Sequence, residues 1–384
     1  MEAYLDNSAT TKVSDGVRDI VVKTMTEDFG NPSSLHMKGI EAERYLRAAR
    51  EITAKSLKAE QKEIIFTSGG TEANNMALIG IAEAYKRSGR HIVTTAIEHA
   101  SVLNTMKYLA EQGYSITYLN VNKSGRIDLE ELKKTVTDET ILVSVMYVNN
   151  EIGTVEPVGE IGRIIKEKNP NTIFHTDAIQ AFGKYKIYPK KLKIDALSVS
   201  GHKIHGPKGA GFLYLADGVK LRPIIHGGGQ QRGLRSGTDN VPGIAGIGQA
   251  VKEAYADMEE KVSEMSRLKD YLTDRLGELP EVRINSGKGT DWAPNIVSVS
   301  FLGVRSEVML HALEEKGVYV SSGSACSSNK PGVSATLKSI GLNKDEIDSA
   351  LRFSLCDTTT GEEINYALEA VRELLPKLRV LRRK

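Results

Sequence analysis

Seven short apolar runs rich in β-branched residues alternate with longer stretches of helical period between about residues 60 and 215. Gly, Pro, Asn or charged residues bound each run, and the runs read EIIFTS, HIVTTAI, SITYLNV, TILVSVMYV, TIFHTDA, ALSVSG and GAGFLYL. Continuous apolar runs are typical of strands that helices cover on both faces. The pattern therefore predicts an α/β domain with a doubly wound, mostly parallel, seven-stranded sheet, in which ligands bind at the carboxyl ends of the strands.

Beyond this region the pattern changes, and at 384 residues the chain is long enough for two domains. Apolar residues recur at intervals of three and four from Ile247 to Leu279, which predicts one long amphipathic helix. After it, shorter strand-like and helix-like segments alternate, as in a smaller α+β domain. We expect a large domain at residues 15–259 and a small domain at residues 260–384, with residues 1–14 packing with the small domain.

Charge and cysteine content argue against several classes of protein. Lys and Arg number 51 against 49 Asp and Glu, so no strong overall field would attract nucleic acid. No segment reaches the apolar length that crosses a bilayer. The two cysteines cannot form a disulfide framework, and the first residues lack the features of an export signal. We therefore expect a cytoplasmic protein in which each thiol needs its own explanation.

A lysine and an aspartate follow two of the predicted strands. In SVSGHKIHGPKGAG, Lys203 stands just beyond a strand and between two histidines, where a desolvated pocket would favour the neutral amine that forms a Schiff base. In FHTDAIQ, Asp177 ends a strand and Gln180 follows three residues later. A buried aspartate there could keep a pyridine ring protonated, as a pyridoxal cofactor requires. The alternatives are a solvated lysine at a strand end and an aspartate that caps a helix.

Two further strand ends carry binding features. In IIFTSGGTEANNMAL, a strand runs through Gly69 and Gly70 into a helix that opens near Thr71, which is a typical phosphate-binding turn. It is neither a Walker loop nor GxGxxG, so a cofactor phosphate fits it better than ATP or NAD. In TAIEHAS, His99 could stack on a flat ring and move protons, or it could be a structural histidine.

The two thiols differ in their surroundings. Cys326 lies in SGSACSSNKPG, a polar loop composition in which a thiol is a candidate nucleophile. Cys356 follows the strand-like LRFSL, and we interpret it as a small hydrophobe of the core. Arg352 within LRFSL needs an anion, which could be a substrate carboxylate or an internal salt-bridge partner.

Taken together, these stretches resemble the cysteine desulfurases of the NifS and IscS type, within the fold-type I, class-V aminotransferase family of pyridoxal-phosphate enzymes. The resemblance runs nearly from end to end. It rests on an ordered set of motifs: YLDNSATT, FGNPSSLH, SGGTEANN, EHAS, VNNEIG, HTDAIQ, SGHKIHGPKG, RSGTDN, SGSACSS and LRFSL. A second group of this family, which includes selenocysteine lyases, has its cysteine on a shorter loop with a different motif, and SGSACSS is similar to the first group. The segment SSNKPGVSAT, just beyond Cys326, departs from the sequence expected there.

The resemblance implies a role for each matching residue around pyridoxal 5'-phosphate. Lys203 would hold the cofactor covalently, Asp177 would pair with its ring nitrogen and Gln180 with its phenolic oxygen. His99 would stack on the ring, and Asn150 would contact the cofactor or the substrate. Four residues would hold the phosphate: Gly70, Thr71, Ser200 and His202.

The resemblance also implies a substrate, an assembly and a product. Arg352, with Asn31 nearby, would bind the carboxylate of L-cysteine, and Thr238 would reach the phosphate in the neighbouring subunit of a homodimer. Cys326 would take the sulfur as a persulfide while L-alanine leaves. A sulfur-acceptor protein, such as an iron–sulfur scaffold, would then receive the sulfur. We expect no intrinsic metal, although Cys326 could transiently ligate an iron–sulfur cluster.

Three alternative functions are compatible with parts of this pattern. Selenocysteine lyases and aminotransferases share the scaffold, and fold alone does not separate them. An aminotransferase needs no thiol such as Cys326. A docking module that has kept the fold without catalysis would not need Lys203, Asp177 and His99 together.

Overall fold

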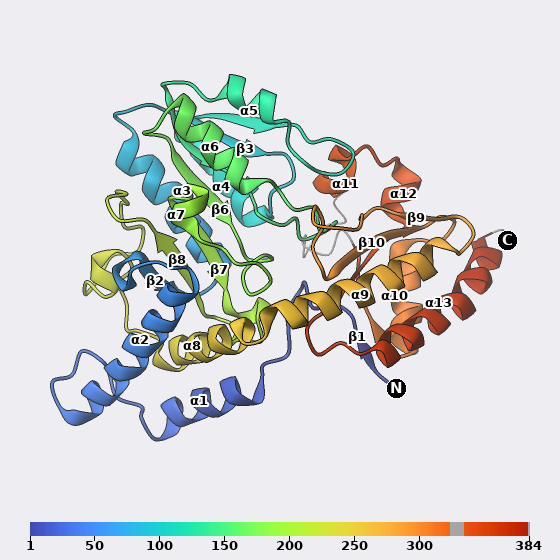
Figure 1. Ribbon diagram of the computed structural model, residues 1–384, viewed down its shortest axis with the longest axis horizontal. Helices are drawn as coiled ribbons and strands as arrows, with labels where there is room; N and C mark the ends of the chain where they lie inside the picture. The colour runs from blue at the N-terminus through green and yellow to red at the C-terminus, as the bar shows by residue number, and fades with distance from the viewer. Residues whose placement is uncertain (323–333, 383–384) are drawn as a thin grey trace.

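The computed structural model describes residues 1–322 and 334–382. Figure 1 shows two lobes, each built around its own main sheet. Cys326, the predicted nucleophile, lies outside the described residues.

The larger lobe contains the predicted seven-stranded sheet. Its strands lie in the order β2 (Ile64–Thr67), β8 (Gly211–Leu215), β7 (Ala196–Ser200), β6 (Ile173–Asp177), β5 (Thr140–Ser144), β3 (His91–Thr95) and β4 (Ser115–Leu119). From β7 to β4 all neighbours are parallel, whereas β8 runs antiparallel to both β2 and β7. The mostly parallel sheet predicted from the apolar runs is confirmed.

Helices cover both faces of this sheet. Ile65 packs in a cluster with α3 (Gly70–Tyr85) and α4 (Ala100–Glu111), which lie on one face. Its neighbour Phe66 belongs to the cluster on the opposite face, which contains residues of α2 (Met37–Ser56) and α8 (Val241–Tyr255). Because successive side chains of a strand point to opposite faces, both must be apolar here, which explains the continuous apolar runs.

Shorter helices complete the larger lobe. They are α1 (Asp15–Thr26), α5 (Leu129–Thr135), α6 (Val158–Lys168) and α7 (Pro189–Leu192), with the 3-10 helices η1 (Gln61–Glu63), η2 (Gly201–Lys203) and η3 (Gln231–Gly233). Among the helices of the described residues, none combines the length and the apolar character that a membrane crossing requires.

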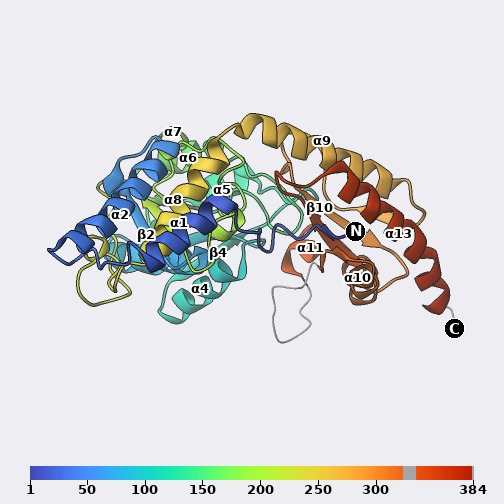
Figure 2. The same ribbon diagram turned by 90° about the horizontal axis from the view of Figure 1, so that it is seen from below.

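The smaller lobe is built on an antiparallel sheet in the order β12 (Ser321–Ser322), β13 (Ala350–Ser354), β10 (Ile296–Phe301) and β9 (Val282–Ile284). The chain start joins this lobe, because β1 (Ala3–Tyr4) pairs with β11 (Val318–Tyr319). Figure 2 shows the N-terminus beside the C-terminal helix. The helices of this lobe are α9 (Met258–Gly277), α10 (Ser306–Glu315), α11 (Ala335–Ser339), α12 (Lys344–Asp348) and α13 (Gly361–Arg382).

The prediction of one long helix from Ile247 to Leu279 is wrong. The chain turns at Asp257, whose φ of 52° and ψ of 30° are left-handed and end the run of α8 before α9 begins. The apolar spacing continues across the break because the two helices serve different cores. Ile247 packs in the larger lobe, whereas Leu268 packs in the smaller one. In Figures 1 and 2, α9 crosses from one lobe to the other.

Candidate active site

A cavity of about 320 Å³ lies at the carboxyl ends of the central strands, beside β13 of the smaller lobe. Parallel ladders bring strand ends to one edge, and here Asp177 of β6 pairs in register with Ser198 of β7. Most of the predicted site residues line this cavity: Gly70, Thr71, His99, Asn150, Asp177, Gln180, Ser200, His202, Lys203 and Arg352.

Asp177 ends β6 with 4% of its surface exposed. One carboxylate oxygen, Oδ2, accepts a hydrogen bond of 2.8 Å from the side-chain amide of Asn74. The other, Oδ1, accepts one of 3.0 Å from the backbone N–H of Ile179. The aspartate thus closes a turn and does not cap a helix, since the next helix begins only at Pro189, and its carboxylate is fixed in orientation where it lines the cavity.

His99 is the N-cap residue of α4, and its Nδ1 accepts a hydrogen bond from the Ser101 backbone N–H at 3.2 Å. Burial is the main reason why the pKa of His99 is lowered; Asp177 opposes this effect and Lys203 adds to it. The ring is thus neutral near pH 7, and because Nδ1 accepts, its proton sits on Nε2. A neutral, oriented imidazole of this kind can stack on a flat ring.

Lys203 ends η2, immediately after β7. Its Nζ donates to the backbone carbonyl oxygens of Ser8 at 2.5 Å and Ala9 at 2.7 Å. Gln180 donates to the same Ser8 oxygen at 3.0 Å. The segment after β1 therefore meets the sheet edge at the predicted Schiff-base lysine, and it brings two residues that the sequence did not single out.

The turn before α3 has the geometry of an anion site. The N-cap Gly69 adopts φ 149° and ψ −173°, a conformation that side-chain-bearing residues rarely adopt. A Cβ on Gly70 would lie 2.1 Å from Cδ1 of Ile179, so any larger residue here would require the Ile179 side chain to move. The first N–H groups of α3 are left without intrahelical partners and can bind a phosphate.

His202 and Ser200 flank this turn. Ser200 ends β7 with 3% of its surface exposed. Nδ1 of His202 lies 3.1 Å from the Thr10 hydroxyl. Burial, followed by the charges of Lys203 and Lys208, lowers the pKa of His202 to about 4, so this ring is neutral and acts through hydrogen bonds.

Arg352 projects from β13 with 7% of its side chain exposed. Its two terminal nitrogens donate to the Asn150 carbonyl oxygen at 2.8 Å and to Oδ1 of Asp6 at 2.9 Å. The internal salt bridge considered from the sequence thus exists. Its Nε is nevertheless buried without a hydrogen-bond partner in the described part of the chain, which leaves one donor for a bound anion.

Two predicted residues do not line the cavity. Asn31 is exposed in the loop before α2, and its Oδ1 accepts from the backbone N–H of Ser33 at 2.9 Å. Thr238 is exposed just before α8. The exposure of Thr238 leaves it accessible to a neighbouring subunit.

Several residues in the cavity or directly behind it were missed by the sequence interpretation. Asn74 stands three residues after Thr71, so helical spacing puts both on one face of α3. That spacing was the available signal for the partner of Asp177. Ser8, Ser101 and Ser321 line the cavity itself, but they come from three separate segments, and no local pattern marks them.

The interpretation of Cys356 as a core hydrophobe is wrong. β13 ends at Ser354, so Cys356 falls in the turn beyond the pleated strand and does not alternate into the core. The residue is partly exposed, and its Sγ lies 3.1 Å from the Thr358 hydroxyl.

Comparisons with known proteins agree with this architecture. Residues 3–367 match the family described as Aminotransferase class-V. Cysteine desulfurase IscS of Clostridium botulinum is 45% identical over 98% of this chain and 95% of the relative. Its counterpart in Methanosarcina thermophila is 46% identical over 98% of this chain and 92% of the relative.

Solved structures agree as well. A NifS-like protein matches with a TM-score of 0.93 at 42% identity, over 98% of this chain and all of the other. The NifS-like protein from Rickettsia africae matches with a TM-score of 0.87 at 31% identity, over 98% of this chain and all of the other. The chain therefore belongs to the class-V aminotransferase family and, within it, to the cysteine desulfurases of the NifS and IscS type.

Proposed function

We propose that this chain is a pyridoxal-phosphate-dependent cysteine desulfurase that places the sulfur of L-cysteine on Cys326 and releases L-alanine. One observation carries the proposal: Lys203, Asp177 and His99 line a single cavity at the sheet edge, next to the start of α3. A binding module would not require a lysine, a buried carboxylate and a neutral imidazole together. The relatives named cysteine desulfurase support the same activity.

The residues present fit pyridoxal phosphate. Buried polar atoms of the described cavity residues lack partners, namely Oγ of Ser8 and Nε of Arg352, and a ligand would satisfy them. Gly70 and Thr71, at the start of α3, line the cavity, so the first N–H groups of this helix are placed to bind the phosphate. Lys203 would hold the cofactor, and Asp177 would face its ring nitrogen. The bound cofactor would supply an electron sink for charge that develops at Cα of the substrate.

The chain's own residues would then bind the substrate and move its protons. Arg352 would bind the substrate carboxylate through Nε and the remaining N–H of a terminal nitrogen, because Asp6 and Asn150 hold the guanidinium in place. The amine of Lys203 would take the proton from Cα and return a proton to Cβ. His99, kept neutral by burial, would stack on the ring without adding a positive charge.

Sulfur transfer balances without an external oxidant or reductant. The Cys326 thiolate would attack the sulfur of the substrate, forming an S–S bond as the Cβ–S bond breaks. The electron pair of that bond stays with Cβ, which takes the proton and becomes the methyl group of alanine. One L-cysteine and one thiol thus give one L-alanine and one persulfide.

We also propose a homodimer. Six apolar side chains around the end of α1 and the start of α2 are between 42% and 98% exposed: Val22, Met25, Phe29, Leu35, Met37 and Ile40. A group of this kind is typical of an interface. In such a dimer, Thr238 would reach the phosphate bound by the partner subunit.

The remaining expectations stay proposals. The division into residues 15–259 and 260–384, with residues 1–14 on the smaller unit, is supported by separate hydrophobic clusters in the two lobes. A cytoplasmic location and an acceptor such as an iron–sulfur scaffold follow from the likeness to IscS proteins.

The proposed function is tested by incubating the purified protein with L-cysteine and a reductant and measuring alanine and sulfide. The wild type should give equal yields, and Cys326→Ala should give neither. Cys356→Ala is the matched thiol control and should react like the wild type. Undiminished sulfide from Cys326→Ala would remove this thiol from the mechanism, and alanine formed only when pyruvate is added as the amino-group acceptor would favour an aminotransferase.

A further inference from the structure

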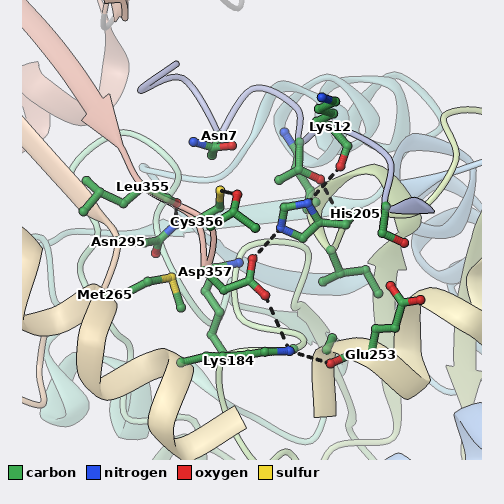
Figure 3. A pocket seen from close by; sticks show the side chains of 18 of the residues that line it. Asn7, Lys12, Lys184, His205, Glu253, Met265, Asn295, Leu355, Cys356 and Asp357 are labelled. Carbon is green, nitrogen blue, oxygen red and sulfur yellow. Dashed lines mark hydrogen bonds and ion pairs between the residues drawn. The ribbon is translucent and has the colours of Figure 1, made fainter. Parts of the chain in front are cut away.

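A second cavity, of about 460 Å³, shares Lys203 with the first and is shown in Figure 3. The turn after η2 contributes His205, and the turn after β13 contributes Cys356 and Asp357. One potential ligand atom of each lies within 4.8 Å of the other two. None of the three has a role in the proposed desulfuration.

We propose that His205, Cys356 and Asp357 form a site for a divalent transition metal ion of the zinc class. A thiolate, an imidazole and a carboxylate are the ligands that zinc combines in proteins, whereas calcium and magnesium prefer sets of oxygen atoms. Ligand atoms about 2.0–2.3 Å from zinc stand roughly 3–4 Å apart, so small side-chain rotations would close the observed group around an ion.

The imidazole of His205 is already oriented for this role. Its Nδ1 lies 2.8 Å from the carbonyl oxygen of Lys12 and donates to it, which leaves Nε2 as the metal-binding atom. The backbone of His205 has a φ of 61°, an uncommon left-handed conformation for histidine. The Thr11 hydroxyl accepts from its backbone N–H at 2.8 Å. The segment before α1 thus fixes the ring in place.

Asp357 offers one oxygen atom to the same point. Its Oδ1 is buried and lies 2.8 Å from Nε2 of His205, with which it forms an ion pair when the imidazole is protonated. The other oxygen, Oδ2, lies 3.6 Å from Nζ of Lys261, which is itself held by the Glu253 carbonyl oxygen at 2.8 Å. A metal ion that binds here would displace the imidazole proton that faces Asp357.

The charges are compatible with a divalent ion. A thiolate and a carboxylate together neutralise the ion, and Lys261 remains paired with the outer carboxylate oxygen. Three protein ligands leave a fourth position open to the cavity for water or a small ligand. The competing possibility is a plain ion pair between His205 and Asp357, in which no metal binds.

Zinc alone is the probe that separates these possibilities. The cofactor-loaded protein is treated with a chelator, dialysed against Zn²⁺, and its bound metal counted. The wild type and the matched thiol control Cys326→Ser should bind one zinc per chain. Cys356→Ser and His205→Gln should bind it at least about 10–100-fold more weakly. Unchanged cofactor absorption shows that each variant is folded, and having two ligand variants covers the failure of either one.

Co²⁺ provides an independent readout of the ligands. The wild type loaded with Co²⁺ should show ligand-field absorption typical of a four-coordinate site, at wavelengths longer than those at which the cofactor absorbs, and Cys356→Ser should lose it. No retained zinc in the wild type, or equal affinity in Cys356→Ser, would overturn the proposal. Neither measurement uses turnover, so the outcome is independent of the proposed function.

Discussion

His202 and His205 stand three residues apart in one turn, yet the two cavities that meet at Lys203 give them opposite charge states. His202 is buried and faces Lys203 and Lys208, so its pKa falls to about 4. Burial would also lower the pKa of His205, but the contacts with Asp357 and Cys356 raise it to about 10.

The difference shows that residues distant in the sequence determine the charge states of the histidines in this turn. The local sequence GHKIHG treats the two histidines alike. The groups that separate them, Cys356 and Asp357, follow β13 about 150 residues later. The first cavity therefore keeps its imidazoles neutral beside a cofactor, and the second holds His205 protonated against Asp357 until a metal ion displaces that proton.

Removing the lysine shared by both cavities should separate their functions most strongly. Lys203→Ala should lower alanine and sulfide formation by at least about 10²–10⁴-fold, because it loses the amine that moves protons and holds the cofactor. Zinc binding at Cys356 should persist in the same variant. Alanine formation within tenfold of the wild type would contradict the assignment of Lys203.

In the metal-free protein, the pH dependence of stability should reveal the opposite charge states of His202 and His205. The folded pKa of His205 is raised above its unfolded value of about 6.5, so its stabilisation is complete below pH 6.5 and is lost as pH rises towards 10. For His202 the folded pKa is lowered, so stability falls as pH drops from about 6.5 to 4.

Urea unfolding at a series of pH values measures both effects. His205→Gln should flatten the alkaline loss and His202→Gln the acidic loss. His311→Gln, which changes an exposed histidine of α10, is the control and should do neither. An alkaline profile that His205→Gln leaves unchanged would contradict the charged cluster.

The first cavity, unlike the second, is proposed to bind the substrate carboxylate, and Arg352 is the residue that tests this difference. Arg352→Lys keeps the charge but loses the fork of donors, so the KM for L-cysteine should rise about 10–100-fold with little change in kcat. Steady-state kinetics measures KM and kcat separately. Arg283→Lys, on β9 of the same sheet and partly exposed beside Glu346, is the matched control and should behave like the wild type. An unchanged KM in Arg352→Lys would remove Arg352 from substrate binding.

Gly70→Ala should have the smallest effect, and only on the first cavity. The added Cβ would overlap with Cδ1 of Ile179, so the cofactor should bind about tenfold more weakly, in the range of overpacking costs near 1–3 kcal/mol. Titration of the cofactor-free protein with pyridoxal phosphate gives the affinity. Ile179→Val removes the clashing atom and should restore much of the affinity in the double variant; a failure to do so would mean that the overlap is not the cause.

The sequence predicted the parts of the fold that depend on local periodicity. Continuous apolar runs indicated the strands because helices cover both faces of the sheet. The ends of those runs indicated Asp177, His99 and Lys203 as candidate site residues. The break at Asp257 could not be predicted, because the apolar spacing continues through it while the chain changes cores.

The sequence could not predict what the lobes bring together. Cys356 followed an apolar strand and looked like a core residue, but the strand ends two residues earlier and the thiol faces His205 instead. Asp6 was likewise not foreseen as the partner of Arg352, because 346 residues separate them in the chain.

The central claim is that the amine of Lys203 carries the cofactor. Borohydride reduction of the cofactor-loaded protein, followed by peptide mass mapping, tests it most directly. The account predicts one reduced pyridoxyl group per chain, on the peptide that contains Lys203. A label on another lysine, such as Lys184 or Lys208, or no label at all, would contradict it.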